Sequence, residues 1–185
     1  MANEYRRGNP VRLTEGPFDY YPDISPDGNW IVFSRAPNAG TLSTWKISIN
    51  GGTPTLITDK INSFGAVISP DGKQIAFGEV TDSNALRKIL VLPFEVGPPT
   101  ITFDVSEGSF QFLRWAPDGN GIDYIRHVDG VSNIWRQPIS GGAPKQLSNF
   151  RDLRIWNFAW SRDGKRIALS RGSAERDVLL IKDFR

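Results

Sequence analysis

The sequence of 185 residues contains no cysteine and a single histidine. Without cysteine, a disulfide framework, a thiolate nucleophile and a zinc site with cysteine ligands are excluded. A serine triad would need His127 as its base, and the Gly-x-Ser-x-Gly motif of a nucleophile elbow does not occur. We interpret His127 as a surface residue at the end of a strand, and we predict no catalytic residue and no enzyme.

Long apolar runs and blocks of like charge are also missing. No run approaches the ~20 apolar residues of a membrane-spanning helix, and the polar residues 1–7 are not followed by the apolar core of a signal peptide. The net charge is +2, with no five basic residues in succession, which is a weak field for a nucleic acid. We therefore predict no membrane segment and no nucleic-acid partner. The compartment, cytoplasm or periplasm, stays open.

A repeated turn is the main positive signal. Segments related to Ser-Pro-Asp-Gly begin at Ser25, Ser69, Ala116 and Ser161, at intervals of 44, 47 and 45 residues. Proline presets φ at the second turn position, aspartate suits the third, and glycine accepts the left-handed conformation that follows. A period of this length is typical of stacked supersecondary units.

Strand patterns surround each turn. The run after each turn alternates, with apolar residues at 31 and 33, 75 and 77, 122 and 124, and 167 and 169, so one face of each strand is buried. A third strand is expected at 45–49, 88–92, 134–139 and 178–181. A short fourth strand is expected at 56–58, 101–103 and 146–148.

Four short antiparallel strands in about 45 residues are one blade of a β-propeller. We therefore predict an all-β protein, a propeller of four-stranded antiparallel blades with four repeats in the chain. A β-sandwich is the alternative, although it does not need a strict repeat. Residues 1–9 are expected to be a disordered leader before a propeller at 10–185. The expected blades are about 19–58, 64–104, 110–148 and 155–185.

The two ends of the chain are expected to meet. The last unit lacks a fourth strand, and residues 11–14 match the fourth strands of the other units. This segment can complete the last blade and remove an exposed edge. Two arrangements satisfy this expectation, namely a closed four-bladed ring or an eight-bladed homodimer with exchanged terminal strands. We favour the homodimer, because compact blades usually form rings of six to eight, but the sequence does not decide the ring size.

The succession of Leu-Thr, Ser-Pro-Asp-Gly, an apolar strand, Ile-Trp and Gly-Gly resembles the TolB-like propeller repeat, a relative of WD40, from Val11 to Arg185. The Trp-Asp dipeptide of true WD40 blades is missing. The stretch from Val178 to Arg185 also resembles the ends of long bacterial sensor proteins, in which propeller repeats follow a protein kinase or a winged-helix domain. The resemblance implies a propeller, here a sensor domain, and says little about its ligand.

Equivalent positions in the repeats predict a binding surface at one mouth of the channel. Seven residues after each turn glycine stand Arg35, Glu79, Arg126 and Arg171, and five residues before each turn stand Tyr20, Phe64, Gln111 and Trp156. Forked arginine donors and rigid aromatic rings are typical of recognition surfaces. The predicted binding residues are Arg35, Arg126, Arg171, Tyr20, Phe64, Trp156 and Arg154. The simpler interpretation is aromatic strand packing with solvated arginines.

The sequence thus favours a non-catalytic binding or scaffold module that recognises a protein or peptide at the channel mouth. An acidic peptide, a protein segment and an anionic small molecule are the ligands that this mouth would fit. The turn aspartates are spread one per blade, so no metal site or cofactor is predicted. Asp19 and Asp23 are the carboxylates that could face the channel. Two alternatives stay open, a truncated or engineered propeller fragment without a ligand of its own and an enzyme that uses the central channel.

Overall fold

The computed structural model describes residues 10–16, 18–36, 42–58, 62–80, 86–105 and 109–173. The expected leader at 1–9 and the expected third strand at 178–181 lie outside these residues. The described residues form strands and turns and no helix, so none of them forms a helix that is long and apolar enough to cross a membrane.

Four antiparallel sheets follow one another along the chain, and each strand pairs with its neighbours in sequence. The first sheet contains β1 (Asp19–Ile24), β2 (Trp30–Arg35), β3 (Ser43–Ser48) and β4 (Thr55–Leu56). The second contains β5 (Ser63–Ile68), β6 (Gln74–Val80), β7 (Leu86–Pro93) and β8 (Ile101–Asp104). The third contains β9 (Ser109–Trp115), β10 (Gly121–Val128), β11 (Val131–Pro138) and β12 (Lys145–Gln146). The described part of the fourth contains β13 (Arg154–Trp160) and β14 (Ile167–Gly172). The prediction of an all-β protein with four-stranded antiparallel blades is confirmed.

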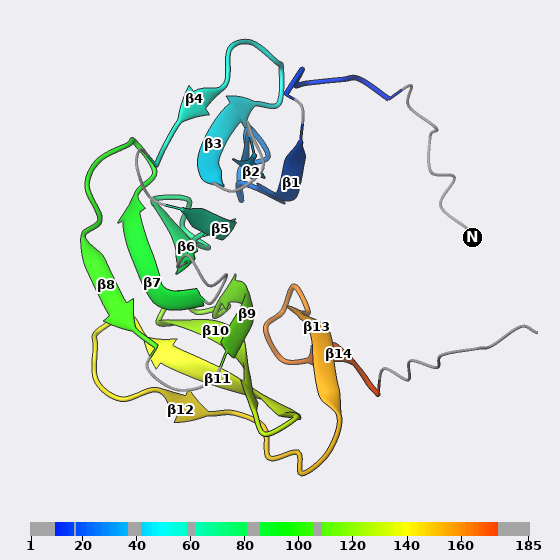
Figure 1. Cartoon of the computed structure of the whole chain (residues 1–185). Helices are drawn as coiled ribbons and strands as arrows, with labels where there is room; N and C mark the ends of the chain where they lie inside the picture. Colours follow the sequence, from blue (N-terminus) through cyan, green and yellow to red (C-terminus); the bar gives the residue numbers. More distant parts are fainter. Residues whose placement is uncertain are drawn as a thin grey trace, which may run out of the picture.

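The sheets are arranged along an arc, with β1, β5, β9 and β13 on its inner side (Figure 1). The first and last sheets stand at the two open ends of this arc (Figure 1). The arc places the four inner strands around one shared space, which is where the candidate site lies.

The repeated turns have the conformation that the sequence predicts. Gly28 has a φ of 74°, and its amide donates to the Ser25 carbonyl oxygen at 2.8 Å. The Ser25 hydroxyl donates to the Asp27 carboxylate and accepts from the Trp30 amide at 2.9 Å. These bonds hold the start of β2 against the end of β1. The hydroxyls of Ser69 and Ser161 make the same contacts in the second and fourth turns.

The outer strands β4 and β12 are shorter than expected, because a hydroxyl replaces part of their ladder, whereas β8 covers the whole expected range. The Thr58 hydroxyl accepts from the Thr44 amide at 2.8 Å, and the Ser148 hydroxyl accepts from the Ile134 amide at 2.9 Å. Both hydroxyls stand where the chain leaves one blade for the next. Serine and threonine commonly compete with ladder bonds in this way.

The apolar core lies between adjacent blades. Val32 and Ile57 of the first blade pack with Ile75 and Phe77 of the second in one buried cluster. A second cluster joins the second and third blades, and a third joins the third and fourth. Each sheet is therefore held by its neighbours as well as by its own ladder, which is the stacking logic of repeat proteins.

Candidate functional site

Each inner strand contains a β-bulge near its middle. The pairing of β1 with β2 is interrupted between Tyr20 and Asp23, equivalent interruptions occur in β5 and β9, and the interruption in β13 lies one residue earlier, between Ile155 and Asn157. Tyr21, Gly65 and Phe112 stand at equivalent positions in these bulges, with φ values of 53°, 65° and 50°. A left-handed conformation is uncommon for Tyr and Phe. Bulges of this kind redirect side chains at functional sites.

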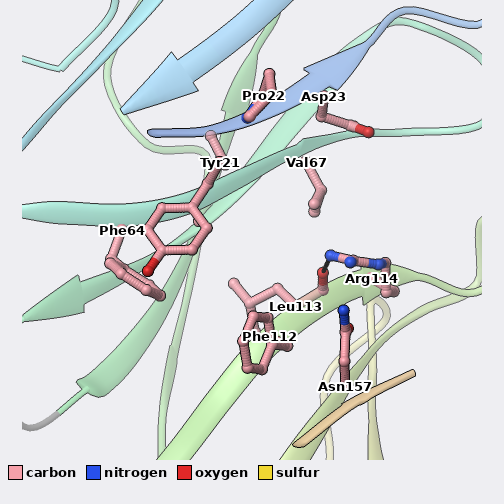
Figure 2. Close-up of a pocket in the computed structure, with 11 residues that line it drawn as sticks. Tyr21, Pro22, Asp23, Phe64, Val67, Phe112, Leu113, Arg114 and Asn157 are labelled. Carbon is pink, nitrogen blue, oxygen red and sulfur yellow. Dashed lines mark hydrogen bonds between the residues drawn. The ribbon is translucent and has the colours of Figure 1, made fainter. Parts of the chain in front are cut away.

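The bulges line a cavity of about 430 Å³ between the inner strands. Residues of all four blades contribute to its wall. Figure 2 shows the rings of Tyr21, Phe64 and Phe112 on one side, with Asp23, Arg114 and Asn157 around the remaining rim. The cavity is thus aromatic on one flank and polar on the other. This is the usual composition of a ligand site.

Asp23 and Arg114 supply opposite charges to this cavity. Asp23 Oδ2 accepts from the Ile68 amide at 2.8 Å. Burial raises the pKa of the Asp23 carboxyl, against the Ile68 amide and the charge of Arg114, which lower it. Burial also lowers the pKa of the Arg114 guanidinium, against the Asp23 charge, which raises it. Arginine still keeps its charge in proteins.

The Arg114 guanidinium retains donors for a ligand. Within the described part of the chain, its one hydrogen bond runs from Nη1 to the Leu113 carbonyl oxygen, at 2.8 Å (Figure 2). A guanidinium carries five donors in a rigid fork that fits a carboxylate or a phosphate. Arg114 therefore presents an anion-binding group to the cavity.

A row of aromatic rings leads from the mouth into the cavity. Phe18 stacks on Tyr20 with 6.3 Å between ring centroids, Tyr20 contacts Tyr21 at 6.1 Å, and Tyr21 contacts Phe64 at 4.5 Å. Phe18, Tyr20 and Tyr21 are exposed. Exposed contiguous rings of this kind mark interaction surfaces.

The arginines that the sequence selects are held by partners in the chain. Arg35 binds Asp19 through two bonds of 2.7 and 2.9 Å, and Arg171 binds the Asp152 carboxylate at 2.7 Å. Arg126 lies over the Trp135 ring at 4.6 Å. The hydrogen bond from Arg35 is the main cause that lowers the pKa of Asp19.

The other predicted residues fall in two groups. Tyr20 and Phe64 belong to the aromatic row, while Trp156 and Arg154 lie exposed on β13. Of the two carboxylates expected at the channel, Asp23 lines the cavity and Asp19 holds Arg35. Whether this mouth binds a partner stays a prediction.

Sequence reasoning missed Arg114, Phe112 and Asn157. Phe112 and Asn157 align with Tyr21, six residues before the turn aspartate, and Arg114 aligns with Asp23. Extending the repeat alignment to these positions would have found them. Strict alternation of strand faces could not show that they share a cavity with Phe64, because the bulge interrupts the alternation.

The structure shows where His127 lies. Its Nδ1 is 2.6 Å from the Ser132 hydroxyl, and Ser132 is fully buried. Burial, followed by the charge of Arg154, lowers the pKa of His127. A substrate cannot reach a buried serine, so this pair does not form a nucleophile and base. No three His, Asp or Glu residues in the described ranges gather as a metal site would require.

No protein-family model matches the chain. The crystal structure of TolB from Acinetobacter baumannii is similar over 82% of this chain and 37% of that chain, with a TM-score of 0.65 and 22% identity. The fold is that of a TolB-like β-propeller. A second structure with a related fold, an oligogalacturonate lyase in complex with manganese, matches 86% of this TolB-like propeller and 48% of the lyase chain. Its TM-score is 0.62, with 16% identity.

Two relatives found by sequence are each less than 30% identical to this chain. An uncharacterized protein of Agrobacterium fabrum is 28% identical over 132 residues, 65% of this chain and 44% of the relative. Dipeptidyl-peptidase 5 of Porphyromonas gingivalis is 23% identical over 174 residues, 84% of this chain and 25% of the relative. The chain spans less than half of these relatives. A peptidase and a lyase occur among the names, so the comparisons alone favour neither a binding module nor an enzyme.

Proposed function

We propose that this TolB-like propeller is a non-catalytic binding module that captures an acidic segment of a partner protein or peptide in the space between its inner strands. The observation that carries the proposal is Arg114. Its guanidinium faces a cavity of about 430 Å³, with one hydrogen bond to the described part of the chain.

The shape and chemistry of the cavity fit a peptide. The aromatic row gives an extended chain rigid apolar area to pack on, and Asn157 and Arg114 offer polar groups on the opposite flank. Aromatic residues and arginine dominate the binding energy of most protein interfaces. A carboxylate in the segment would bind Arg114 through two parallel hydrogen bonds.

The mouth belongs to the same proposal. Tyr20 contacts Tyr21 of the cavity wall, and Trp156 and Arg154 belong to the same strand as Asn157. All three side chains are exposed and would contact the parts of the partner that remain outside the cavity. Arg126, which lies over the Trp135 ring, contributes positive charge that attracts an acidic partner. Asp19 and Asp152 offset the charges of Arg35 and Arg171, so an acidic partner would have to compete with these carboxylates for the two arginines. A homodimer with exchanged terminal strands would present this mouth twice.

The proposal assigns no catalytic residue: among the described residues His127 pairs with a buried serine, and no group of three metal-ligating side chains is found there. The alternative of a fragment without a ligand is an outcome of the following test.

The test compares two short fluorescein-labelled peptides of identical length, one of Glu, Phe and Gly and one with Gln in place of Glu. We expect the propeller to bind the Glu peptide more tightly in fluorescence polarisation. Arg114→Gln should weaken that binding by at least about tenfold, because a hydrogen bond to a charged group contributes about 1.5–3 kcal/mol. The control Arg162→Gln removes an exposed arginine of the fourth turn and should leave binding unchanged.

Equal binding of the Glu peptide by wild type and Arg114→Gln would exclude Arg114 as the anchor. Equal binding of both peptides by the wild-type protein would contradict an acidic partner. Binding of neither peptide would favour a fragment without a ligand.

A further inference from the structure

One position of the repeat carries opposite charges in the first and third blades. Asp23, Val67, Arg114 and Ala159 stand at this position, four residues before each turn aspartate. The second and fourth blades place apolar side chains there, so an inner strand does not need a charge at this position. The Asp23 carboxylate and the Arg114 guanidinium therefore require another explanation, and both line the cavity between the inner strands.

The two charged side chains are neighbours that do not touch. Figure 2 shows Val67 between Asp23 and Arg114. Among the described residues, neither a hydrogen bond nor an ion pair joins Asp23 to Arg114. Burial raises the pKa of Asp23 and lowers the pKa of Arg114, and the charge of each group opposes this effect in the other. The two charges are thus close enough to interact and too far apart to bond directly, which leaves a gap that a ligand can bridge.

Both side chains keep capacity for such a ligand. The Ile68 amide donates to Asp23 Oδ2 at 2.8 Å, so a ligand would donate to Oδ1. Arg114 donates from Nη1 to the Leu113 carbonyl oxygen at 2.8 Å, so within the described ranges Nε and Nη2 remain for a carboxylate. The cavity wall therefore offers a negatively charged acceptor and a positively charged set of donors.

A single acidic residue does not match this pair of charges. Its carboxylate would bind Arg114 and would also approach the like charge of Asp23, and such a juxtaposition weakens binding. Both wall charges are half-buried, so partial loss of water already destabilises them. A ligand with one charge of each sign would pair both side chains and leave no net charge in the half-buried space.

An extended peptide can supply two such charges on one side. Side chains two positions apart point to the same face of an extended chain and are about 7 Å apart. The rings of Tyr21, Phe64 and Phe112 line the other flank of the cavity (Figure 2) and would pack on the aliphatic stem of a lysine or on a neighbouring apolar residue. The volume of about 430 Å³ lies in the range of sites that take small ligands and short segments.

We propose that the captured segment carries a basic residue two positions from its acidic residue, with the carboxylate on Arg114 and the basic group on Asp23. This inference rests on the function proposed above and specifies the segment that the cavity takes. Segments with both charges would be selected over segments with a single acidic residue, because they satisfy both side chains. Asp23 would also disfavour a purely acidic run.

Two fluorescein-labelled peptides that differ by one charge test the inference. One contains Phe and the sequence Glu-Gly-Lys, and the other has acetyl-lysine in place of Lys, which keeps the stem and removes the charge. Each is also made in the order Lys-Gly-Glu, because a segment can enter the cavity in either direction. In fluorescence polarisation, we expect the wild-type protein to bind the lysine peptide of one order at least about fivefold more tightly than its acetylated counterpart.

The variant Asp23→Asn should abolish this preference. It removes the carboxylate charge and keeps an oxygen that can accept from the Ile68 amide. It should bind the acetylated peptide at least as tightly as wild type does, because the like charge is gone. Asp104→Asn is the matched control, since Asp104 is an exposed aspartate of the outer strand β8, and it should keep the preference.

Equal binding of the lysine and acetyl-lysine peptides by wild type, in both orders, would overturn the inference. So would a preference for the lysine peptide that Asp23→Asn retains. If Arg114→Gln still weakens the binding of all the peptides in these cases, the function proposed above stands and the basic residue alone is excluded. If wild type binds none of the peptides, the proposed function fails and this inference fails with it.

Discussion

The indole Nε1 of Trp160 donates a hydrogen bond of 2.9 Å to Asp123 Oδ2 across the junction between the third and fourth blades. Asp123 is fully buried and also accepts from Arg136, at 2.6 and 2.9 Å. The Asp123 carboxylate thus accepts hydrogen bonds from Arg136 of its own blade and from Trp160 of the next blade. The junction is polar at its centre and apolar around it.

Replacing this carboxylate should be costly. Asp123→Ala leaves the Arg136 guanidinium without its partner, and we expect the free energy of unfolding in urea to fall by about 3–5 kcal/mol. Trp160→Phe removes one neutral donor and should cost about 1 kcal/mol. The double variant should lose less than the sum of the two, because both substitutions remove the same bond. Additive losses would show that the two residues are not coupled.

Lys46 tests a different kind of junction. It is buried, its Nζ donates to the Phe94 carbonyl oxygen at 2.8 Å, and it lies 4.3 Å from the Phe94 ring centroid. Burial lowers the pKa of Lys46, because loss of contact with water destabilises its charged ammonium group. We expect Lys46→Met to change the free energy of unfolding by less than about 1.5 kcal/mol, and Lys46→Ala to lower it by about 2–4 kcal/mol through the cavity it leaves. Equal losses would show that the charge, and not the aliphatic stem, holds the junction.

The ion pair of Asp19 and Arg35 predicts a dependence of stability on pH. Arg35 lowers the pKa of Asp19 below 3.8, so the unfolded chain takes up this proton first as the pH falls. The stabilisation is complete above the unfolded pKa and is lost as the pH falls through the folded one. Asp19→Asn should therefore unfold at a lower temperature than wild type near neutral pH, by the equivalent of about 1 kcal/mol. The difference should shrink below about pH 3. A difference that stays constant across this range would contradict the ion pair as its cause.

Substitution of Gly65 tests whether the backbone of the β-bulges is strained. An added Cβ would meet no atom within 4 Å, and the φ of +65° is the remaining obstacle to a side chain. We expect Gly65→Ala to lower the free energy of unfolding by about 1–2 kcal/mol, the cost of a left-handed conformation. Gly97→Ala is the control, since Gly97 does not have a positive φ and an added Cβ would make ordinary contacts there. It should be neutral or slightly stabilising. Equal effects at both glycines would show that the bulge conformation is not strained.

The repeat determined much of the fold by itself. A turn with proline, aspartate and glycine at fixed places dictates its own conformation, as the φ of Gly28 and Gly119 shows. The alternating runs after each turn predicted one buried face of β2, β6 and β10, which includes Phe33, Ile75 and Tyr124. The residues between them, such as Val32, Ala76 and Asp123, are buried as well, because neighbouring blades cover both faces of these strands. Local chemistry decides these features, so they are readable without a structure.

Which residues share the candidate site could be learned only from the tertiary structure. Phe112 and Arg114 share a cavity with Tyr21 and Phe64 only because the bulges reset the side-chain direction and the arc brings the inner strands of successive blades together. The sequence selected Arg35 and Arg171 at the mouth, but it could not show that Asp19 and Asp152 hold them. A periodic pattern determines the repeating unit. The contacts between units depend on packing and on paired charges, which only the assembled fold brings together.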